Sequence, residues 1–372
     1  MVWSPQWGDR AYPHPLRDAQ SKRPEGSSIM AIDVEKIARR RLLSGIAAAL
    51  TAVHALCSVP AVAQQPTPAD EIIVTLLGTG SPQPLAARFG PATLVQAGGL
   101  TLLFDAGRGV TVRLYQLGLS SGKGLDAIFL THYHSDHVAG LPDLWMTGYM
   151  FGPFGSRAHP MKLWGPSESP TAPSGAERIA KGLTEAFADD VRIRQTDERI
   201  AAASTQIEAR GFHADGVVFD QAGVKVTAFA VDHGALIKPS VGYRIDFGAR
   251  SVTISGDTKF DENLIKHATG TDVLIHEVFA IAPRLAALPM LKAIADHHTS
   301  PEQAGTVFVR TKPRLAVYSH FALIETPLED ILTRTRTTYQ GPLEAGEDLM
   351  RIAIGHDIKV QRWNPEQRKY PR

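Results

Sequence analysis

The stretch THYHSDHVAG, from Thr131 to Gly140, places four metal-ligand side chains within six positions: His132, His134, Asp136 and His137. The apolar residues DAIFL precede it and predict a buried strand that ends at the cluster. His132 and His134 are two apart in extended chain, so they point to the same side. Asp136 and His137 lie in the following turn and can face a second point nearby. A solvated polar turn is the alternative, but so many ligands at one strand end predict a binuclear hydrolytic metal centre.

Three later apolar segments also end in ligand-type residues. TAFAVDH ends at His233, SVTISGD ends at Asp257 and RLAVYSH ends at His320. Because a sheet holds the ends of its strands rigidly, we expect these side chains to complete the site. Histidine and carboxylate ligands without thiolate favour zinc, with manganese or iron as alternatives. The only cysteine, Cys57, lies before the predicted mature chain, so a disulfide within the chain is also excluded.

The composition is that of an ordinary globular protein. The 372 residues include 39 basic and 38 acidic side chains, a formal net charge of +1, and 44% of them are hydrophobic. This charge balance indicates no strong attraction to nucleic acid or to an anionic membrane surface.

The N-terminal residues predict an export signal. KIARRR (36–41) is basic, LLSGIAAALTAVHAL (42–56) is apolar but too short to favour a membrane span, and AVA (61–63) offers a small-residue cleavage site. We therefore expect residues 30–63 to be a signal peptide that is removed after Ala63. The protein would then be periplasmic or secreted and would keep no stable membrane anchor. A buried amphipathic helix is the alternative.

The rest of the chain predicts one domain. Residues 1–29 are rich in Pro, Arg and Ser and are expected to be a disordered or upstream extension. In residues 64–372, apolar strands come in two series with covering helices, which predicts an α/β fold, a four-layer αβ/βα sandwich, rather than a singly wound parallel sheet. The irregular segment 151–220 lies between the metal motifs, so we expect it to shape a substrate pocket. Its aromatic side chains would stack a ring-bearing substrate or form a core under a long loop.

Local signals predict individual elements. Gly98 and Gly99 between two apolar segments predict a hairpin turn. The segments 138–150 and 174–190 are each predicted as one helix. A further helix is expected after HHTS, with Thr299 or Ser300 as its N-cap and Pro301 at its first position.

The chain resembles the metallo-β-lactamase superfamily, and within it the tRNase Z-like and arylsulfatase-like branch. THYHSDH is the HxHxDH motif of that superfamily, and GTGSPQP, FDAG, VDHG, SGDT, IHEV, HHTSPEQA and YSHF follow the order seen in the branch. The resemblance covers about Ile72 to Tyr339 and implies the metallo-β-lactamase fold with two Zn²⁺ ions. It assigns His132, His134 and His233 to one zinc, Asp136, His137 and His320 to the second, and Asp257 to a bridge between them.

The resemblance also implies a mechanism. A hydroxide between the metals would be the nucleophile, and the metals would take the charge that develops on phosphoryl, sulfuryl or carbonyl oxygens. His298 matches the histidine of the tRNase Z HST element and Glu277 the glutamate of its HEAT element, a pair that protonates the leaving oxygen. Asp136, Glu277 and His298 are thus the candidate catalytic residues, with structural polar roles as the alternative for the last two. The adjacent His276 and His297 are not expected to take part.

The sequence departs from tRNase Z at one place. Short tRNase Z proteins carry a long flexible arm between the residues matching His233 and Asp257, and this arm clamps tRNA. Here His233 and Asp257 are only 24 positions apart. The near-neutral net charge lacks the basic footprint of phosphate-backbone binding, and export would separate the protein from tRNA. We therefore do not expect nucleic acid to be a partner.

The expected function is an exported binuclear zinc hydrolase that attacks an ester, either a phosphodiester or an aryl sulfate. A β-lactamase or lactonase on the same metal core is the first alternative, and a true tRNA 3′-processing endoribonuclease is the second. A redox protein is disfavoured, because di-iron relatives usually carry glutamate in place of His134. The expected partners are small ester, sulfate or lactam substrates. The oligomeric state stays open, although homodimers are common in the resembling family.

Overall fold

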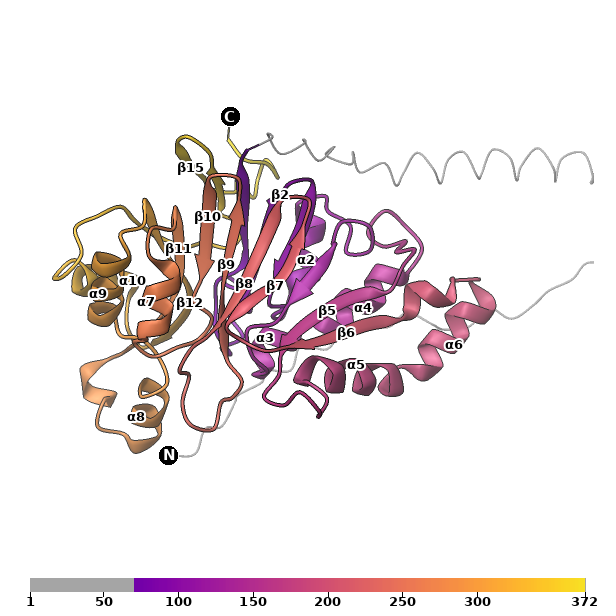
Figure 1. The fold of residues 1–372 in the computed structure, drawn as a ribbon, viewed down its shortest axis with the longest axis horizontal. Coiled ribbons are helices and arrows are strands. Elements are labelled where there is room, and N and C mark those ends of the chain that lie inside the picture. Colours follow the sequence, from indigo (N-terminus) through magenta and orange to yellow (C-terminus); the bar gives the residue numbers. More distant parts are fainter. Residues whose placement is uncertain (1–69, 372) are drawn as a thin grey trace, which may run out of the picture. The chain divides into compact units, whose positions relative to one another are not determined.

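The computed structural model describes residues 70–371, so residues 1–29 and the predicted signal peptide lie outside the described residues. The described residues form two mixed β-sheets (Figure 1). In pairing order the eight strands of the first sheet are β15 (Ile358–Gln361), β14 (Arg351–Ile354), β1 (Ile72–Gly78), β2 (Ala92–Ala97), β3 (Leu100–Phe104), β4 (Ala127–Phe129), β5 (Met161–Pro166) and β6 (Ile207–Phe212). The seven strands of the second are β13 (Leu343–Ala345), β12 (Leu315–Ile324), β11 (Val273–Ile281), β10 (Arg250–Ile254), β9 (Val241–Phe247), β8 (Val224–Ala230) and β7 (Gly216–Gln221).

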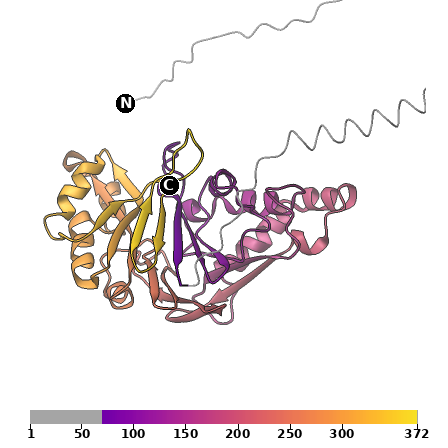
Figure 2. The same ribbon diagram turned by 90° about the horizontal axis from the view of Figure 1, so that it is seen from above.

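Helices cover the outer face of each sheet, as the views in Figures 1 and 2 show. The first sheet is covered by α2 (Val110–Gln116), α4 (Leu141–Tyr149) and α5 (Gly175–Ala186), and the second by α7 (Glu262–Ala268), α9 (Pro301–Thr311) and α10 (Leu328–Thr335). The remaining helical segments are α3 (Ser135–Val138), α6 (Ala188–Asp197), α8 (Pro289–Ala295) and the short 3₁₀ turns η1 (Ala202–Thr205) and η2 (Pro283–Leu285). This arrangement confirms the predicted four-layer αβ/βα sandwich.

Three clusters of buried side chains separate the four layers. Strand alternation sorts them: Leu102 and Phe104 of β3 face the core between the sheets, whereas Leu103 between them faces the helices of the first sheet. On the second sheet, Val317 of β12 faces the core between the sheets and its neighbour Ala316 faces α9 and α10. Both sheets thus bury both faces, which explains why their strands read as continuous apolar runs.

Local predictions are confirmed where turn and cap chemistry is strong. Gly98 and Gly99 form the hairpin turn with φ of 57° and 78°, values that glycine adopts without steric cost. The N-cap of α9 is Ser300, whose Oγ accepts a hydrogen bond from the backbone N–H of Gln303 at 3.3 Å. The side chain of Gln303 accepts in return from the backbone N–H of Ser300 at 3.0 Å, which completes a capping box.

The helix predicted over 138–150 is present as α4, which begins at Leu141, and the short helix α3 precedes it and ends at Val138. Gly140 occupies the break because a Cβ there would lie 2.3 Å from the carbonyl oxygen of Gly107. The helix predicted over 174–190 ends at Ala186, and α6 follows after Phe187. The break at Gly140 comes from close packing against another segment, which helical periodicity does not register.

The segment 151–220 is more regular than its composition suggested. It contributes β5, α5, α6, β6 and most of β7, so it extends both sheets. Phe212 lies in the core between the sheets with Trp164 packed against it, and Phe187 packs edge-on against Trp145 with ring centroids 6.3 Å apart. These aromatic side chains therefore form core, and the pocket described below is lined by other residues. Among residues 70–371, no helix has the length and apolar content needed to cross a membrane.

Candidate metal centre

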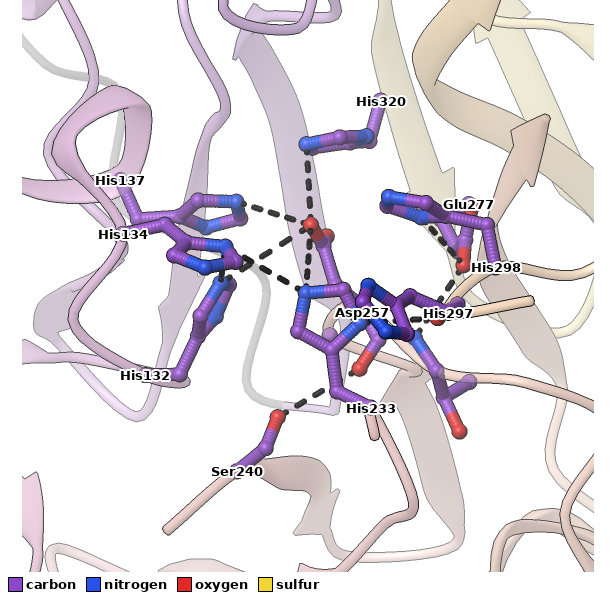
Figure 3. A network of polar contacts seen from close by, with 12 residues as sticks. His132, His134, His137, His233, Ser240, Asp257, Glu277, His297, His298 and His320 are labelled. Atoms are coloured by element: carbon purple, nitrogen blue, oxygen red, sulfur yellow. Dashed lines mark hydrogen bonds and ion pairs between the residues drawn. The ribbon is translucent and has the colours of Figure 1, made fainter. Parts of the chain in front are cut away.

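The predicted metal ligands converge at one edge of the two sheets, although they come from four places in the chain (Figure 3). His132 and His134 follow β4, His233 follows β8, and Asp257 follows β10. Each therefore comes just after a strand end, as predicted. The figure shows the histidines of the first cluster approaching from one side and those of the later strands from the other.

His320 is placed differently from its prediction. The sequence predicts a strand that ends at His320, but β12 continues to Ile324. Its pairing with β11 shifts here, so that Ser319 and His320 oppose the single residue Glu277. His320 takes a left-handed φ of 46° in this bulge. A bulge re-aims a side chain without ending the strand, which brings His320 to the metal centre.

The first ligand set consists of His132, His134, His233 and Asp257, whose ligand atoms all lie within 4.8 Å of one another. The Nε2 atom of His132 is 3.0 Å from Nδ1 of His134, and Nε2 of His233 is 3.4 Å from the same atom. Ring nitrogens from two segments of the chain thus point at one another, which is the arrangement that a bound cation requires.

The second set consists of Asp136, His137 and His320, again with ligand atoms within 4.8 Å of one another. Asp257 reaches this set as well. Its Oδ2 lies 3.3 Å from Nε2 of His137 and 3.2 Å from Nε2 of His320, compared with 3.9 Å and 3.7 Å to the Nε2 atoms of His132 and His233. Asp257 therefore lies between both sets, in the position of a bridging ligand.

The chemistry of these donors fits divalent cations. The side chain of His137 is buried, yet its Nε2 has no hydrogen-bond partner. Burial lowers the pKa of His233 to about 4 and holds the pKa of His132 well below its usual range, so both rings are neutral, the form that binds metals. Burial lowers the pKa of His320 too, but the charge of Asp257 together with the hydrogen bond to Asp136 and its charge raises that pKa above its usual value. The buried carboxylates of Asp136 and Asp257 thus favour a positive charge between the two ligand sets.

Two groups that sequence reasoning missed hold the ligands in orientation. Asp105 accepts a hydrogen bond from Nδ1 of His137 at 2.8 Å and also binds the backbone N–H of Thr131 at 2.8 Å. The backbone carbonyl of His297 lies 2.8 Å from Nδ1 of His233. Such contacts fix the ring tautomer and direct Nε2 at the metal. The FDAG motif, an acidic residue directly after a strand, was the available signal for Asp105.

The predicted pair of Glu277 and His298 is formed. Nδ1 of His298 lies 3.0 Å from Oε1 of Glu277, which also accepts from the backbone N–H groups of Thr258 and Thr299. Burial lowers the pKa of His298, but the charge of Glu277 and this hydrogen bond raise it to about 9. His298 is thus a protonated imidazole beside the metal ligands at neutral pH. His276 is buried against Phe308 and is not part of either ligand set.

Comparison with known proteins gives three kinds of match. A family model described as the β-lactamase superfamily domain matches residues 101–321. Ribonuclease Z of Mycolicibacterium gilvum (strain PYR-GCK) is 34% identical over 76% of this chain and 96% of its own length, and Ribonuclease Z of Mycobacterium avium (strain 104) is 35% identical over 76% and 98%. Among solved structures, the metallo-β-lactamase fold protein YhfI from Bacillus subtilis is 20% identical with a TM-score of 0.57, covering 77% of this chain and 100% of its own. Human tRNase Z, short form, is 21% identical with a TM-score of 0.54, covering 77% and 99%.

These relatives contradict the expected function and the expected partners. The curated relatives that match most of the chain are named Ribonuclease Z, which contradicts the expected small-molecule esterase. The absence of an arm does not distinguish this chain from the first relative. The alignment with the first relative spans 289 positions and includes 76% of this chain, about 283 residues. The relative can therefore have only a few additional residues within the alignment, too few for a long arm. Net charge, summed over the whole chain, also says nothing about one face of it.

Proposed function

The chain belongs to the β-lactamase superfamily and, within it, to the ribonuclease Z family, and on that premise we propose that it is an endoribonuclease that cleaves phosphodiester bonds in tRNA precursors. Its class as a metal-dependent hydrolase follows from the family. The observation that carries the proposal is the pair of ligand sets that meet at Asp257, with Glu277 and His298 beside them, in a chain 34% identical to Ribonuclease Z.

The two ligand sets would hold two zinc ions, with manganese or iron as alternatives. His132, His134 and His233 would bind the first, and Asp136, His137 and His320 the second, with Asp257 shared. Such a pair of cations would supply Lewis acidity, which would lower the pKa of water so that hydroxide is available at neutral pH, and would offset charge on phosphoryl oxygens.

The residues around the ligands supply the proton. Glu277 binds Nδ1 of His298, so the Nε2 proton of the imidazolium is the one available to the pocket that His298 lines. As the bond between phosphorus and the leaving oxygen breaks, His298 gives this proton to that oxygen. The backbone N–H groups of Thr258 and Thr299 keep Glu277 in place, because both donate to its Oε1. Asp136 would act as a metal ligand.

The test uses the zinc-loaded full chain with a tRNA precursor that carries a 3′ extension and, separately, with bis(p-nitrophenyl) phosphate. We expect cleavage of both. His132→Ala should abolish both and lower the metal content measured by mass spectrometry. His298→Ala should keep the metal and lower kcat by roughly 100-fold. Hydrolysis of the small diester without cleavage of the precursor, at any ionic strength tested, would refute RNA as the substrate.

A further inference from the structure

A cavity of about 310 Å³ opens directly beside the metal ligands. One side of it is polar and consists of five of the ligands, together with His297 and His298; the five are His134, Asp136, His233, Asp257 and His320. The rest of its lining is mostly apolar and is formed by Pro82, Phe279, Ile294, Ala322 and Ile324, with the uncharged Ser81 and Gln83 on either side of Pro82. No lysine or arginine is among the residues that line it. A polyanionic group would find no counter-charge on the apolar side, whereas an uncharged group would bury surface there.

Some apolar residues of the cavity lie on the same strands as His320 and Glu277. His320, Ala322 and Ile324 are two apart along β12 and line the same cavity, since alternate residues of a strand share a face. On the neighbouring strand β11, Phe279 follows Glu277 by two positions and pairs with Ala322. The cavity therefore extends from the metal centre along these two strands.

Phe279 and α8 fix the remaining wall. The ring of Phe279 is stacked on that of His298, with centroids 5.7 Å apart and an angle of 12° between their planes. Ile294 lines the cavity from α8, and the chain runs from this helix directly to His297, whose carbonyl binds His233. The wall is thus held in place by the same residues that orient the metal ligands.

We infer that this apolar wall is a binding site for the ring of one group attached to the scissile phosphate, which in RNA is an unstacked nucleobase. The inference rests on the proposed function and names the part of the substrate that the pocket recognises. Proteins commonly bind splayed bases on aromatic and apolar side chains, without base-specific contacts. A volume near the lower end of ligand pockets, roughly 300 to 1,000 Å³, suits one nucleoside and excludes a duplex.

The test compares two substitutions on the same helix. Ile294 lines the cavity and is 37% exposed, whereas Met290 is 73% exposed and does not line it. The substrates are p-nitrophenyl phenyl phosphate and p-nitrophenyl methyl phosphate, which share a leaving group and differ only in the retained group. We expect Ile294→Ser to lower the phenyl-to-methyl ratio of kcat/KM by roughly tenfold, through KM, and Met290→Ser to leave it within about twofold.

A binding measurement separates this inference from the proposed function. Isothermal titration of the zinc-loaded chain with phenylphosphonate and methylphosphonate needs no turnover. We expect tighter binding of phenylphosphonate, and loss of that preference in Ile294→Ser alone. An unchanged preference in Ile294→Ser, or an equal loss in Met290→Ser, overturns the ring site even if RNA is cleaved. A preference that depends on Ile294 in a chain that cleaves no RNA leaves the site standing and refutes the proposed function.

Discussion

At the scale of single residues, the groups that hydrogen-bond to the ligand side chains hold those side chains in the orientation that metal binding needs. Asp105 is one of them, since it holds both His137 and the backbone that leads to His132. It does so from a left-handed conformation, with φ of 60°. Asparagine tolerates that conformation better than most residues, so the carboxylate can be neutralised without strain in the backbone.

We expect Asp105→Asn to lower the affinity for the second metal by about 10- to 100-fold, because His137 loses its charged hydrogen-bond acceptor. Competition with a chromophoric chelator measures this affinity. Asp126→Asn is the matched control, since Asp126 also accepts a backbone N–H, from Thr101 at 2.8 Å, but takes no part in the metal centre. Equal metal affinities in the two variants would contradict the orienting role of Asp105.

The pair of Glu277 and His298 predicts a pH dependence. The pKa of His298 is raised to about 9, so its proton is present below that pH and is lost as the pH rises through it. We expect kcat for a phosphodiester to fall on the alkaline side near pH 9. Glu277→Gln removes the charge that raises this pKa and should move the fall to lower pH. Glu302→Gln, which removes a carboxylate paired with Arg334 on the outer helices, should leave the profile in place.

At the scale of elements, one buried carboxylate joins three segments. Asp348 accepts from the backbone N–H of Thr79 at 2.9 Å and from that of Phe89 at 2.8 Å, which fixes both ends of the loop after β1. It also pairs with Arg113 of α2 at 2.8 Å, and both side chains of this pair are largely buried. Pro82, which lines the cavity beside the metal ligands, lies within the loop.

We therefore expect Asp348→Ala to lower the free energy of unfolding by about 3 to 5 kcal/mol, because it leaves Arg113 buried without its partner. Urea denaturation followed by circular dichroism measures this change. Asp357→Ala serves as the control, since the side chain of Asp357 is exposed and pairs only with the exposed His356; its effect should stay within about 0.5 kcal/mol. A loss below 1 kcal/mol in Asp348→Ala would show that the loop is held by other contacts.

The elements that sequence reasoning predicted are those with strong local signals. Both strand series, the hairpin at Gly98 and the cap of α9 at Ser300 are confirmed. Helix α8 was not predicted, because it is short and has no buried side chains. The segment 151–220 was interpreted as irregular, because Pro and Gly interrupt its periodicity, yet pairing with distant strands orders it.

At the scale of the whole molecule, the metal centre lies where the two sheets meet and holds two buried carboxylates, Asp136 and Asp257. Removing the metals leaves these charges facing only histidines. We expect a chelator such as EDTA to lower the midpoint of thermal unfolding and added zinc to restore it, since ligands that bind only the folded state stabilise it. Differential scanning calorimetry measures the midpoint, and His132→Ala should respond less. Identical midpoints with and without chelator would contradict a structural contribution from the metals.

The predicted signal peptide at residues 30–63 is inconsistent with tRNA precursors as the substrate, because export would separate the chain from them. It lies outside the described residues and stays a prediction. If the signal is used, the chain is found outside the cytoplasm and begins at Gln64. If tRNA precursors are the substrate, residues 30–63 remain attached and the chain stays with them. Cell fractionation followed by N-terminal sequencing distinguishes these outcomes.

By itself the sequence determined the sandwich and predicted which residues form the candidate ligand set, because apolar strands and the ligand-type residues that follow them are local patterns. His132, His134, Asp136, His137, His233 and Asp257 all lie where those patterns placed them. Only the tertiary structure decided how far Asp257 lies from each set, how a bulge turns His320 toward them, and which side chains form the apolar wall. These depend on the pairing of strands far apart in the chain, and no local pattern encodes the distance between them.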